Sequence, residues 1–386
     1  LYSGTNPVTP LHRWKMDEGT GATANDTGTG TAANGTITGA TYTNGTLDLD
    51  GNLTIAANGT LSAPRGNLAL SANLDNDGIF THNNGKLLSD GTTYITGDAD
   101  PVFYNFETTS GQTRFQIDTT IQNNLTTSGS TSTTYIWTNK TLTMGTATSA
   151  ATLVHGYSNI WFYAYSGGHL ATLQGASSLY PVVVSGSGTF NFGGGGGIAQ
   201  LSNVDFQRDI TTDGATDHIK LTGDCEFDDI TISAGDTLNV NGQRIQCIDW
   251  TQTGGGSPSA LNIDDSLCIV SGHVDWNGII PTANTGTKLI HSTSAEKNWR
   301  SNYTGDGTFM CTGTQTTMTG YQWASGSDQL DNVIIGSGIF NSNSLNNSTD
   351  NLTIATGGTY TAGSTTITLA GDFTTSGGLL GASCLS

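Results

Sequence analysis

The chain contains few charged residues for its length. Only 11% of its 386 residues are Asp, Glu, Lys or Arg, whereas an average globular domain has about 25%. Basic residues are the scarcer kind, because 12 Lys and Arg stand against 31 Asp and Glu, and the formal net charge is −19. Nucleic acids and anionic membranes are bound through basic patches, so this balance argues against both as partners.

Long apolar stretches and the common signatures of metal and catalytic sites are also missing. No run of about 20 apolar residues occurs, so we expect no membrane insertion. The cysteines form no Cys-x2–4-Cys pair of the kind that binds zinc, and the histidines are dispersed. No Gly-x-Ser-x-Gly sequence is present, and no Gly-Lys-Ser/Thr follows the glycine run at 193–197. We therefore expect no catalytic residue, no cofactor and no bound metal.

Glutamate is rare. The glutamates are Glu18, Glu107, Glu226 and Glu296. Glycoside cleavage requires a pair of carboxylates, so a glycan-cleaving protein would need such a pair in a groove. We interpret the acidic residues around Glu226 as solvated turns and predict no enzyme activity. Calcium at Asp75–Gly78 or Asp48–Gly51 is the alternative to plain Asx/Gly turns, which we favour there.

Glycine and small polar residues are abundant. The chain has 53 Gly, with Thr, Ser and Asn filling much of the remainder, while apolar residues recur throughout in short alternating runs. Threonine favours strands, whereas glycine and asparagine favour turns. Many short strands closed by such turns predict an all-β fold.

The cysteines recur at a regular interval. Cys247 follows Cys225 by 22 residues, Cys268 follows Cys247 by 21, and Cys311 lies 43 residues further on, which is about two such intervals. An apolar residue that returns at a fixed interval indicates an internal repeat. We predict a β-solenoid (β-helix) of about 21–22 residues per coil, in which these cysteines form one inward-facing column of unpaired thiols.

The same pattern covers most of the chain. Asn52–Ala56 returns as Asn351–Ala355, and the cysteine interval continues at Val333 and Ile354. We expect an irregular solenoid with insertions over residues 51–215, where the period blurs between 145 and 200. Residues 216–386 should form a regular solenoid followed by a C-terminal tail. Over 216–375 we expect coils of about 20–23 residues, a length typical of solenoid repeats.

Residues 1–50 differ from the rest. The segments Leu11–Gly21 and Leu47–Gly51 resemble the opening of laminin-G-like, concanavalin-type jelly rolls. The resemblance implies a small N-terminal β module that acts as a cap or an attachment module.

A second resemblance concerns the repeats. Gly78–Leu87 with Phe103–Phe106, and again Gly307–Thr316, resemble repeats of tail-fibre and capsid-fibre proteins of tailed phages, notably marine ones, and of some bacterial surface adhesins. The resemblance implies a structural virion protein, such as a fibre, a spike or a capsid or tail decoration. Such a protein would lie on the virion surface or outside cells, contact other virion proteins and attach to a host surface or its glycans. It carries over no catalytic residues.

Large aromatic residues suggest contacts beyond a single chain. The run Trp161, Phe162, Tyr163 and Tyr165 is either packed or an exposed contact patch, and packing is the favoured interpretation. A slender coil offers little room for large rings, so we expect some to lie between chains of a homotrimer. The residues behind this expectation are Trp137, Trp161, Tyr163, Trp276, Trp299 and Trp323.

Two alternatives stay open. A bacterial cell-surface adhesin should carry a signal peptide and a translocation domain, and neither is visible. A glycan-depolymerising tailspike should carry a clustered acidic pair in a groove.

Overall fold

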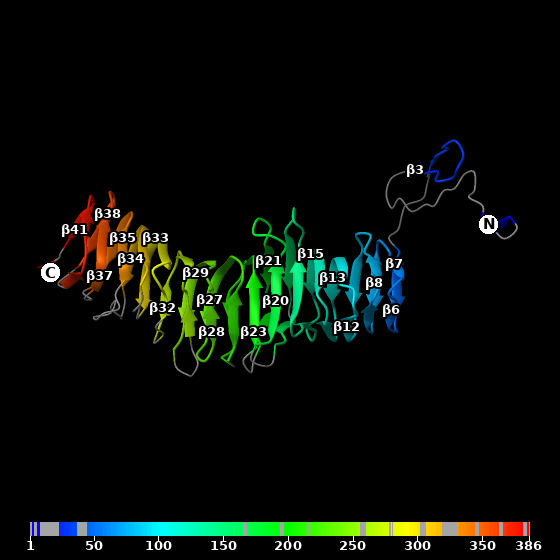
Figure 1. Cartoon of the computed structure of the whole chain (residues 1–386), viewed down its shortest axis with the longest axis horizontal. Helices are drawn as coiled ribbons and strands as arrows, with labels where there is room; N and C mark the ends of the chain where they lie inside the picture. Colours follow the sequence, from blue (N-terminus) through cyan, green and yellow to red (C-terminus); the bar gives the residue numbers. More distant parts are fainter. Residues whose placement is uncertain are drawn as a thin grey trace.

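The chain is built from parallel strands stacked along one long axis (Figure 1). The computed structural model describes residues 2–3, 6–7, 23–36, 45–156, 158–164, 168–193, 197–214, 216–254, 260–277, 279, 281–301, 306–318, 330–343, 347–362, 366–380 and 384–385. Within these ranges every regular element is a strand. A search of the same residues for membrane-spanning helices finds none. The predicted all-β solenoid is confirmed.

Each coil turns through three faces. Face 1 runs through β5 (Leu47–Leu49), β8 (Asn67–Leu70), β11 (Lys86–Ser89), the later parts of β13 (Val102–Thr108) and β15 (Thr119–Thr127), β18 (Ala151–His155), β21 (Val182–Gly186), β24 (Val204–Phe206), the first parts of β27 (Cys225–Ile232) and β29 (Arg244–Gln252), β31 (Leu267–Val270), the first parts of β33 (Lys288–Ser301) and β34 (Thr308–Met318), the later parts of β35 (Leu330–Ile335) and β37 (Asn347–Ile354), and β40 (Phe373–Thr375).

Face 2 follows face 1 in each coil. It comprises β6 (Leu53–Ile55), β9 (Leu74–Asn76), β12 (Thr93–Thr96), β14 (Gln112–Phe115), β16 (Thr133–Ile136), β19 (Asn159–Phe162), β22 (Thr189–Asn191), β25 (Ile210–Thr211), the later parts of β27, β29, β33 and β34, and β32 (Val274–Trp276), β36 (Gly338–Asn341), β38 (Gly358–Thr361) and β41 (Gly378–Leu380).

Face 3 closes the coil. It comprises β7 (Thr60–Ser62), β10 (Ile79–Thr81), the first parts of β13 and β15, β17 (Lys140–Met144), β20 (Leu170–Gly175), β23 (Ile198–Ser202), β26 (His218–Leu221), β28 (Thr237–Asn239), β30 (Ala260–Asn262), the first parts of β35 and β37, β39 (Thr366–Leu369) and β42 (Cys384–Leu385).

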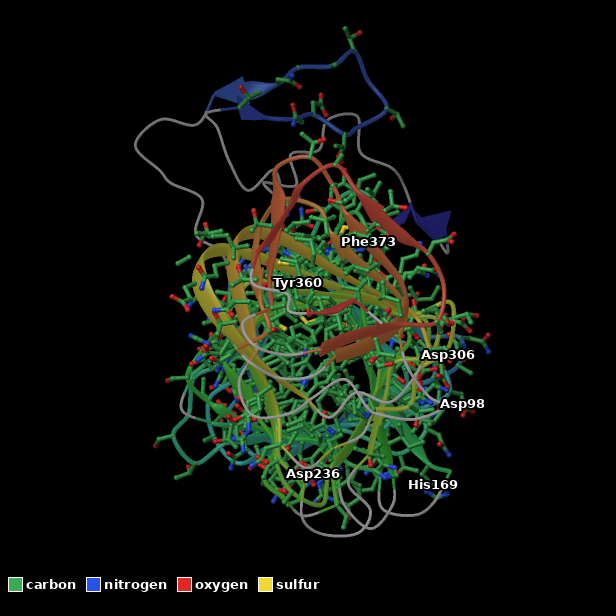
Figure 2. All side chains as sticks on the ribbon, turned by 90° about the vertical axis from the view of Figure 1, so that its left-hand side faces the viewer. Asp98, His169, Asp236, Asp306, Tyr360 and Phe373 are labelled. Atoms are coloured by element: carbon green, nitrogen blue, oxygen red, sulfur yellow. The ribbon has the colours of Figure 1, made fainter. Side chains whose placement is uncertain are left out.

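The interior is a dry apolar column, because alternate side chains of each strand point inward. Figure 2 looks along the axis, with Tyr360 in the carbon-filled interior and Asp98 and Asp306 at the periphery. On face 1, one unbroken inward column pairs each residue with its counterpart in the next coil. Its members are Leu68, Leu87, Phe106, Leu125, Leu153, Val184, Phe206, Phe227, Cys247, Val270, His291, Cys311, Ile335 and Ile354.

The cysteines do not form a single column, so that prediction is wrong. Cys225 pairs with Ile245, which pairs with Cys268 in the following coil. Cys247 instead pairs with Val270. Cys225 and Cys268 therefore occupy a second inward column, two positions before the column of Cys247 on each strand.

The error arises because coil length varies while the inward face is kept. The coil from Cys225 to Ile245 is shorter than the cysteine interval, and the coil from Ile245 to Cys268 is longer. Since strand side chains alternate with a period of two, an offset of two positions leaves a side chain inside.

All four cysteines of the predicted column are nevertheless buried. Cys225, Cys247, Cys268 and Cys311 are free thiols in the interior. Burial raises the pKa of Cys225 to about 12, so this thiol stays protonated and inert.

Longer coils also explain why the sequence repeat is hard to follow between residues 145 and 200. Leu125 pairs with Leu153, and Leu153 pairs with Val184, and both of these coils are well longer than the predicted repeat. The extra residues form turns closed by bridges between Thr146 and Ser149 in one coil and Ser177 and Tyr180 in the next.

The second half is less regular than expected. The coil from Phe309 to Val333 slightly exceeds the predicted range of lengths, and the coil from Val333 to Leu352 falls slightly below it. Both coils keep their inward residues buried, so the interior tolerates these changes at the corners.

The solenoid begins earlier than expected. β5 pairs in parallel with β8, so the strip Leu47–Gly51 belongs to the first coil and not to a separate module. Upstream, β1 (Tyr2–Ser3) pairs with β2 (Asn6–Pro7), and β3 (Thr23–Ala24) with β4 (Gly35–Thr36), both antiparallel. The segment Leu11–Gly21 lies outside the described residues.

Acidic and amide side chains connect successive coils at the corners. Asp118 Oδ1 accepts the N–H of Thr141 at 2.7 Å, and Asp229 Oδ1 accepts the N–H of Asp249 at 3.0 Å. Asp77, in one calcium alternative, accepts an N–H in the same way. Each such bond satisfies a backbone donor where the strand ladder is interrupted. Further examples are Asn52, Asn73, Asn139, Asp224, Asp249 and Asn351.

Three tryptophans fill the interior of the second half. Trp250 and Trp276 are fully buried and Trp299 is 1% exposed, with ring centroids 5.1 and 5.5 Å apart along the series. The expectation that Trp276 and Trp299 lie between chains is therefore wrong. Small partners such as Val274 alternate with the rings and leave them room. Trp323 lies outside the described residues.

Candidate functional site

Aromatic side chains line the outside of face 2 in the first half of the solenoid. Tyr94, Arg114, Tyr135 and Trp161 are paired in register on consecutive strands β12, β14, β16 and β19. Their inward neighbours Ile95, Phe115, Ile136 and Phe162 are fully buried, so the alternation places the four on the outer surface. Together with Trp137 and Tyr163, which directly follow β16 and β19, they are called the aromatic strip below.

Arg114 is at the centre of this strip. Its guanidinium carbon lies 4.9 Å from the ring centroid of Tyr94, 5.1 Å from Tyr135 and 5.3 Å from Trp137. Gln112 Oε1 accepts hydrogen bonds from Arg114 Nε at 3.2 Å and Nη2 at 2.7 Å. Three cation–π contacts and a two-pronged amide contact hold the cation in place against the sheet.

The remaining rings stack across coils. Trp137 and Tyr163 lie face to face, with centroids 4.2 Å apart and planes inclined by 10°. Tyr135 and Trp161 stack at 5.7 Å. Tyr135 is 8% exposed, whereas the other strip residues are half-buried and present part of their rings to solvent.

The structure divides the aromatic run at 161–165, for which packing is the favoured interpretation and an exposed contact patch the alternative. Trp161 and Tyr163 face outward, Phe162 is fully buried in the core, and Tyr165 lies outside the described residues. Tyr94, Arg114 and Tyr135 were missed, because they are separated by about one coil each and form no run in the sequence. The sequence did contain one signal. Each of these residues comes directly before an apolar residue of one inward column on face 2, namely Ile95, Phe115 and Ile136.

A groove interrupts face 2 beyond the strip. β22 is the last strand of the seven-stranded sheet that begins at β6, and β25 pairs onward with β27. Between them lies an open depression of about 210 Å³. Arg208 lies in its wall with its guanidinium 5.7 Å from the Phe190 ring, and burial lowers the pKa of Arg208. The lining residues are Ser187, Gly188, Thr189, Phe190, Arg208, Asp209, Ile210 and Thr211.

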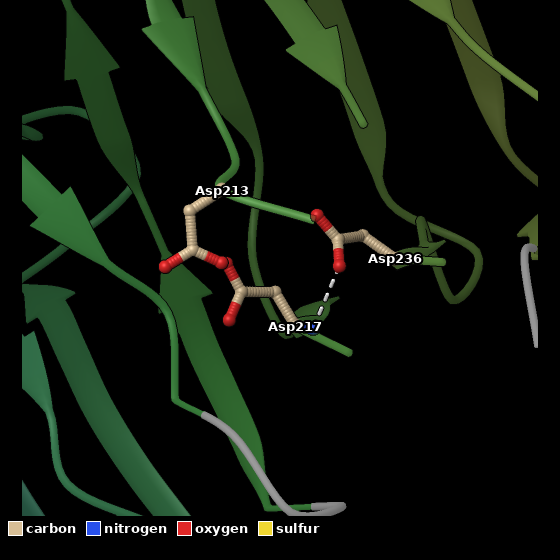
Figure 3. A group of neighbouring side chains, drawn as sticks. All are labelled: Asp213, Asp217 and Asp236. Atoms are coloured by element: carbon tan, nitrogen blue, oxygen red, sulfur yellow. Dashed lines mark hydrogen bonds between the residues drawn. The ribbon is translucent and has the colours of Figure 1, made fainter. Parts of the chain in front are cut away.

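Three carboxylates meet at a corner close to this groove. Asp213 and Asp217 lie between β25 and β26, and Asp236 lies one coil further on, between β27 and β28 (Figure 3). One carboxylate oxygen from each residue lies within 4.8 Å of the others. Asp236 accepts the N–H of Gly214 and the N–H of Asp217, each at 2.9 Å. These bonds tie the two coils together.

Asp217 is fully buried and makes no hydrogen bond through its carboxylate to the part of the chain that the structure describes. Burial, followed by the negative charges of Asp213 and Asp236, raises the pKa of Asp217 to about 7, and the nearby backbone of Asp213 only partly offsets this. The sequence contained only a weak signal for this carboxylate cluster. Asp213 and Asp217 are close together in the sequence, and Asp236 follows about one coil later.

The corner adjoins the aromatic strip. Asn191 is paired with Trp161 on face 2, and its Nδ2 donates to Asp213 Oδ2 at 3.3 Å. The strip, the groove and the carboxylates therefore follow one another along the same side of the solenoid.

Comparison of the chain with protein-family models, curated proteins and solved structures finds no match.

Proposed function

We propose that the chain is an elongated structural protein of a virion, as a fibre, a spike or a capsid or tail decoration, and that it attaches to surface glycans through the aromatic strip. The observation that carries the attachment is the set of stacked, half-buried rings around Arg114 on the outside of face 2. Rigid sheets hold binding groups in place better than loops do.

The chemistry of the strip suits a sugar chain. Pyranose rings have an apolar C–H face that packs on aromatic rings, while their hydroxyls seek donors and acceptors. Trp and Tyr combine an apolar body with a polar tip, and the Arg114 guanidinium and the Gln112 amide add polar groups beside the rings. From Tyr94 to Trp161 the strip covers three coil steps, roughly 14 Å at the usual strand spacing of about 4.8 Å. A few consecutive sugar rings fit that length.

The net charge narrows the ligand class. A charge of −19 repels polyanionic glycans over the whole surface. A neutral glycan is therefore the class we propose, with Arg114 acting as a hydrogen-bond donor to hydroxyls.

The attachment is tested with the full chain on a glycan array, followed by calorimetric titration of the oligosaccharide that the array selects. Trp161→Ala and Trp137→Ala should each weaken binding at least tenfold. Tyr104→Ala is the matched control. The Tyr104 ring stacks on the His82 ring, with centroids 5.7 Å apart, and does not belong to the strip. Binding that survives both tryptophan substitutions, or that the control substitution abolishes, contradicts the proposal.

The virion setting is supported by the resemblance to fibre repeats and by the rigid, elongated shape. Mass spectrometry of purified virions should recover the chain. Recovery from the envelope of uninfected cells would favour the bacterial adhesin alternative, which uses the same strip.

The homotrimer is part of this proposal, although the buried tryptophans no longer support it. What supports it is the exposure of large apolar side chains along the solenoid, among them Leu179 at 83%, Ile79 at 62% and Ile248 at 48%. Light scattering should give a mass of about three chains. A mass near that of one chain, 40.0 kDa, at all concentrations rules the trimer out.

Glycan cleavage is a second candidate, because Asp213 and Asp217 form an acidic pair beside the groove and Asp217 has a raised pKa. Full burial of Asp217 keeps it from a substrate, so we expect no cleavage. Release of oligosaccharides from host glycan, lost in Asp213→Asn, would establish the enzyme instead. Glu226 is not part of this pair, because it is bound by Arg244 at 2.6 Å.

A further inference from the structure

We propose that Asp213, Asp217 and Asp236 form a calcium site that joins two successive coils of the solenoid. Their carboxylates converge from two neighbouring coils, with one oxygen of each inside a 4.8 Å group (Figure 3). A cation there would connect the turn after β25 to the turn after β27.

Asp217 distinguishes this corner from the other acidic corners. Asp77, Asp118 and Asp229 each accept a backbone N–H from the next coil. Asp217 is as deeply buried as the core, and no described donor is at hydrogen-bonding geometry to its oxygens. A buried carboxylate without a partner is costly, and such groups are normally paired or bound to a metal.

The donor set selects the kind of cation. All three side chains offer carboxylate oxygen and none offers nitrogen or sulfur, which favours a hard cation over zinc or copper. Calcium accepts six to eight oxygens in irregular geometry, whereas magnesium requires a near-regular octahedron. Asp236 is already held by two N–H groups, so the geometry is set by the fold and suits the less demanding ion. Asp213 is exposed and gives water access to the remaining positions.

A proton is the competing occupant. Asp213 and Asp236 are the charged groups that face Asp217, and no basic side chain among the described residues contributes to the field at its carboxylate. A proton shared by Asp213 and Asp217 would neutralise the buried carboxylate without a metal.

The test uses the full chain, freed of metal with EDTA and held at pH 8. Calorimetric titration with CaCl2 should show one ion per chain, and calcium should raise the thermal unfolding temperature. Asp217→Asn keeps the shape, removes the buried charge and should weaken calcium binding at least tenfold. Asp213→Asn is the second variant, at an exposed position, and should likewise weaken calcium binding. Asp77→Asn is the matched control and should bind calcium like the unaltered chain.

The outcomes are separable. Absence of calcium binding at millimolar concentration, or equal binding by Asp217→Asn, overturns the proposal. If calcium has no effect, the calcium site is wrong, and a rise in the unfolding temperature of Asp217→Asn at pH 8 then identifies Asp217 as an ionised buried carboxylate without a counter-charge. None of these measurements involves a glycan, so they stand or fall apart from the proposed attachment.

Discussion

Face 2 carries its tryptophans on opposite sides of its wall in the two halves of the solenoid. In the first half Trp137, Trp161 and Tyr163 stack on the outside around Arg114. In the second half Trp250, Trp276 and Trp299 stack inside and are buried. The same kinds of side chain thus serve a surface in one region and the core in the other. A shift of one position in strand phase decides which, because neighbouring side chains point to opposite faces.

The comparison separates stability from recognition. Inside, a ring fills volume that nothing else can fill, so its loss should be felt throughout the neighbouring coils. Outside, a ring covers other rings and Arg114 and can be replaced by water. The inner rings should therefore control unfolding, and the outer rings should control binding.

The largest expected effect is the loss of an inner ring. Trp299→Ala should lower the free energy of unfolding by about 3–5 kcal/mol, because it removes a large buried side chain and leaves a cavity. Urea denaturation followed by far-UV circular dichroism measures this. Trp161→Ala, its outer counterpart, should lose less than about 1.5 kcal/mol. Equal losses of unfolding free energy in Trp299→Ala and Trp161→Ala would refute the assignment of inner rings to stability and outer rings to binding.

The second largest effect is a loss of folding stability at acidic pH, caused by a buried histidine beside the inner tryptophans. His291 lies in the core with its ring 5.2 Å from that of Trp299, and burial lowers the pKa of His291 to about 4, against 6.5 when unfolded. The unfolded chain therefore takes up the proton first, and stability is lost as the pH falls from about 6.5 to 4, by up to about 3 kcal/mol. Thr316 and the carbonyl of Gly272 bond the ring, while the charges facing it are His273 and Lys297.

The measurement is the urea midpoint at a series of pH values, with His291→Gln as the comparison. The variant should lose roughly half of the dependence between pH 6.5 and 4, because burial also lowers the pKa of His155 to about 4. Asp217 acts in the opposite sense, because its raised pKa makes stability fall as the pH rises from about 4 to 7. A profile that His291→Gln leaves unchanged would show that this histidine is not responsible.

A smaller effect is expected from Arg114. Arg114→Gln removes the cation–π contacts with Tyr94, Tyr135 and Trp137, each worth about 0.5–1 kcal/mol at exposed sites. The loss of stability should be about 1.5–3 kcal/mol at most, while glycan binding falls because the outer rings lose their common anchor. Arg114→Lys retains the charge and should recover part of both. Unaltered glycan binding in Arg114→Gln would remove Arg114 from the proposed site.

The smallest effect is spectroscopic. Trp137 and Trp161 are half-buried, so acrylamide should quench their fluorescence, whereas Trp250, Trp276 and Trp299 should be protected. A chain carrying Trp137→Phe and Trp161→Phe should show less quenching than the unaltered chain and nearly the same stability. Unchanged quenching would mean that the outer rings are covered, for example between chains of an oligomer.

The cysteines show how far sequence reasoning reaches. Their spacing correctly indicated stacked coils with inward side chains, because burial and strand period are local properties. Their spacing could not reveal that Cys225 and Cys268 share one column while Cys247 belongs to another. That assignment depends on how long each corner is, and corners of different length preserve the face equally well.

By itself the sequence determined the all-β solenoid, its approximate period and its apolar interior, since these follow from short alternating strands and Gly/Asn turns. Only the tertiary structure decided the register. Register brings Tyr94, Arg114, Tyr135 and Trp161 into one strip although each comes from a different coil. It also brings Asp236 beside Asp213 and Asp217. Both sites combine residues that are distant in the sequence, and contacts between coils are set by the length of every corner between them.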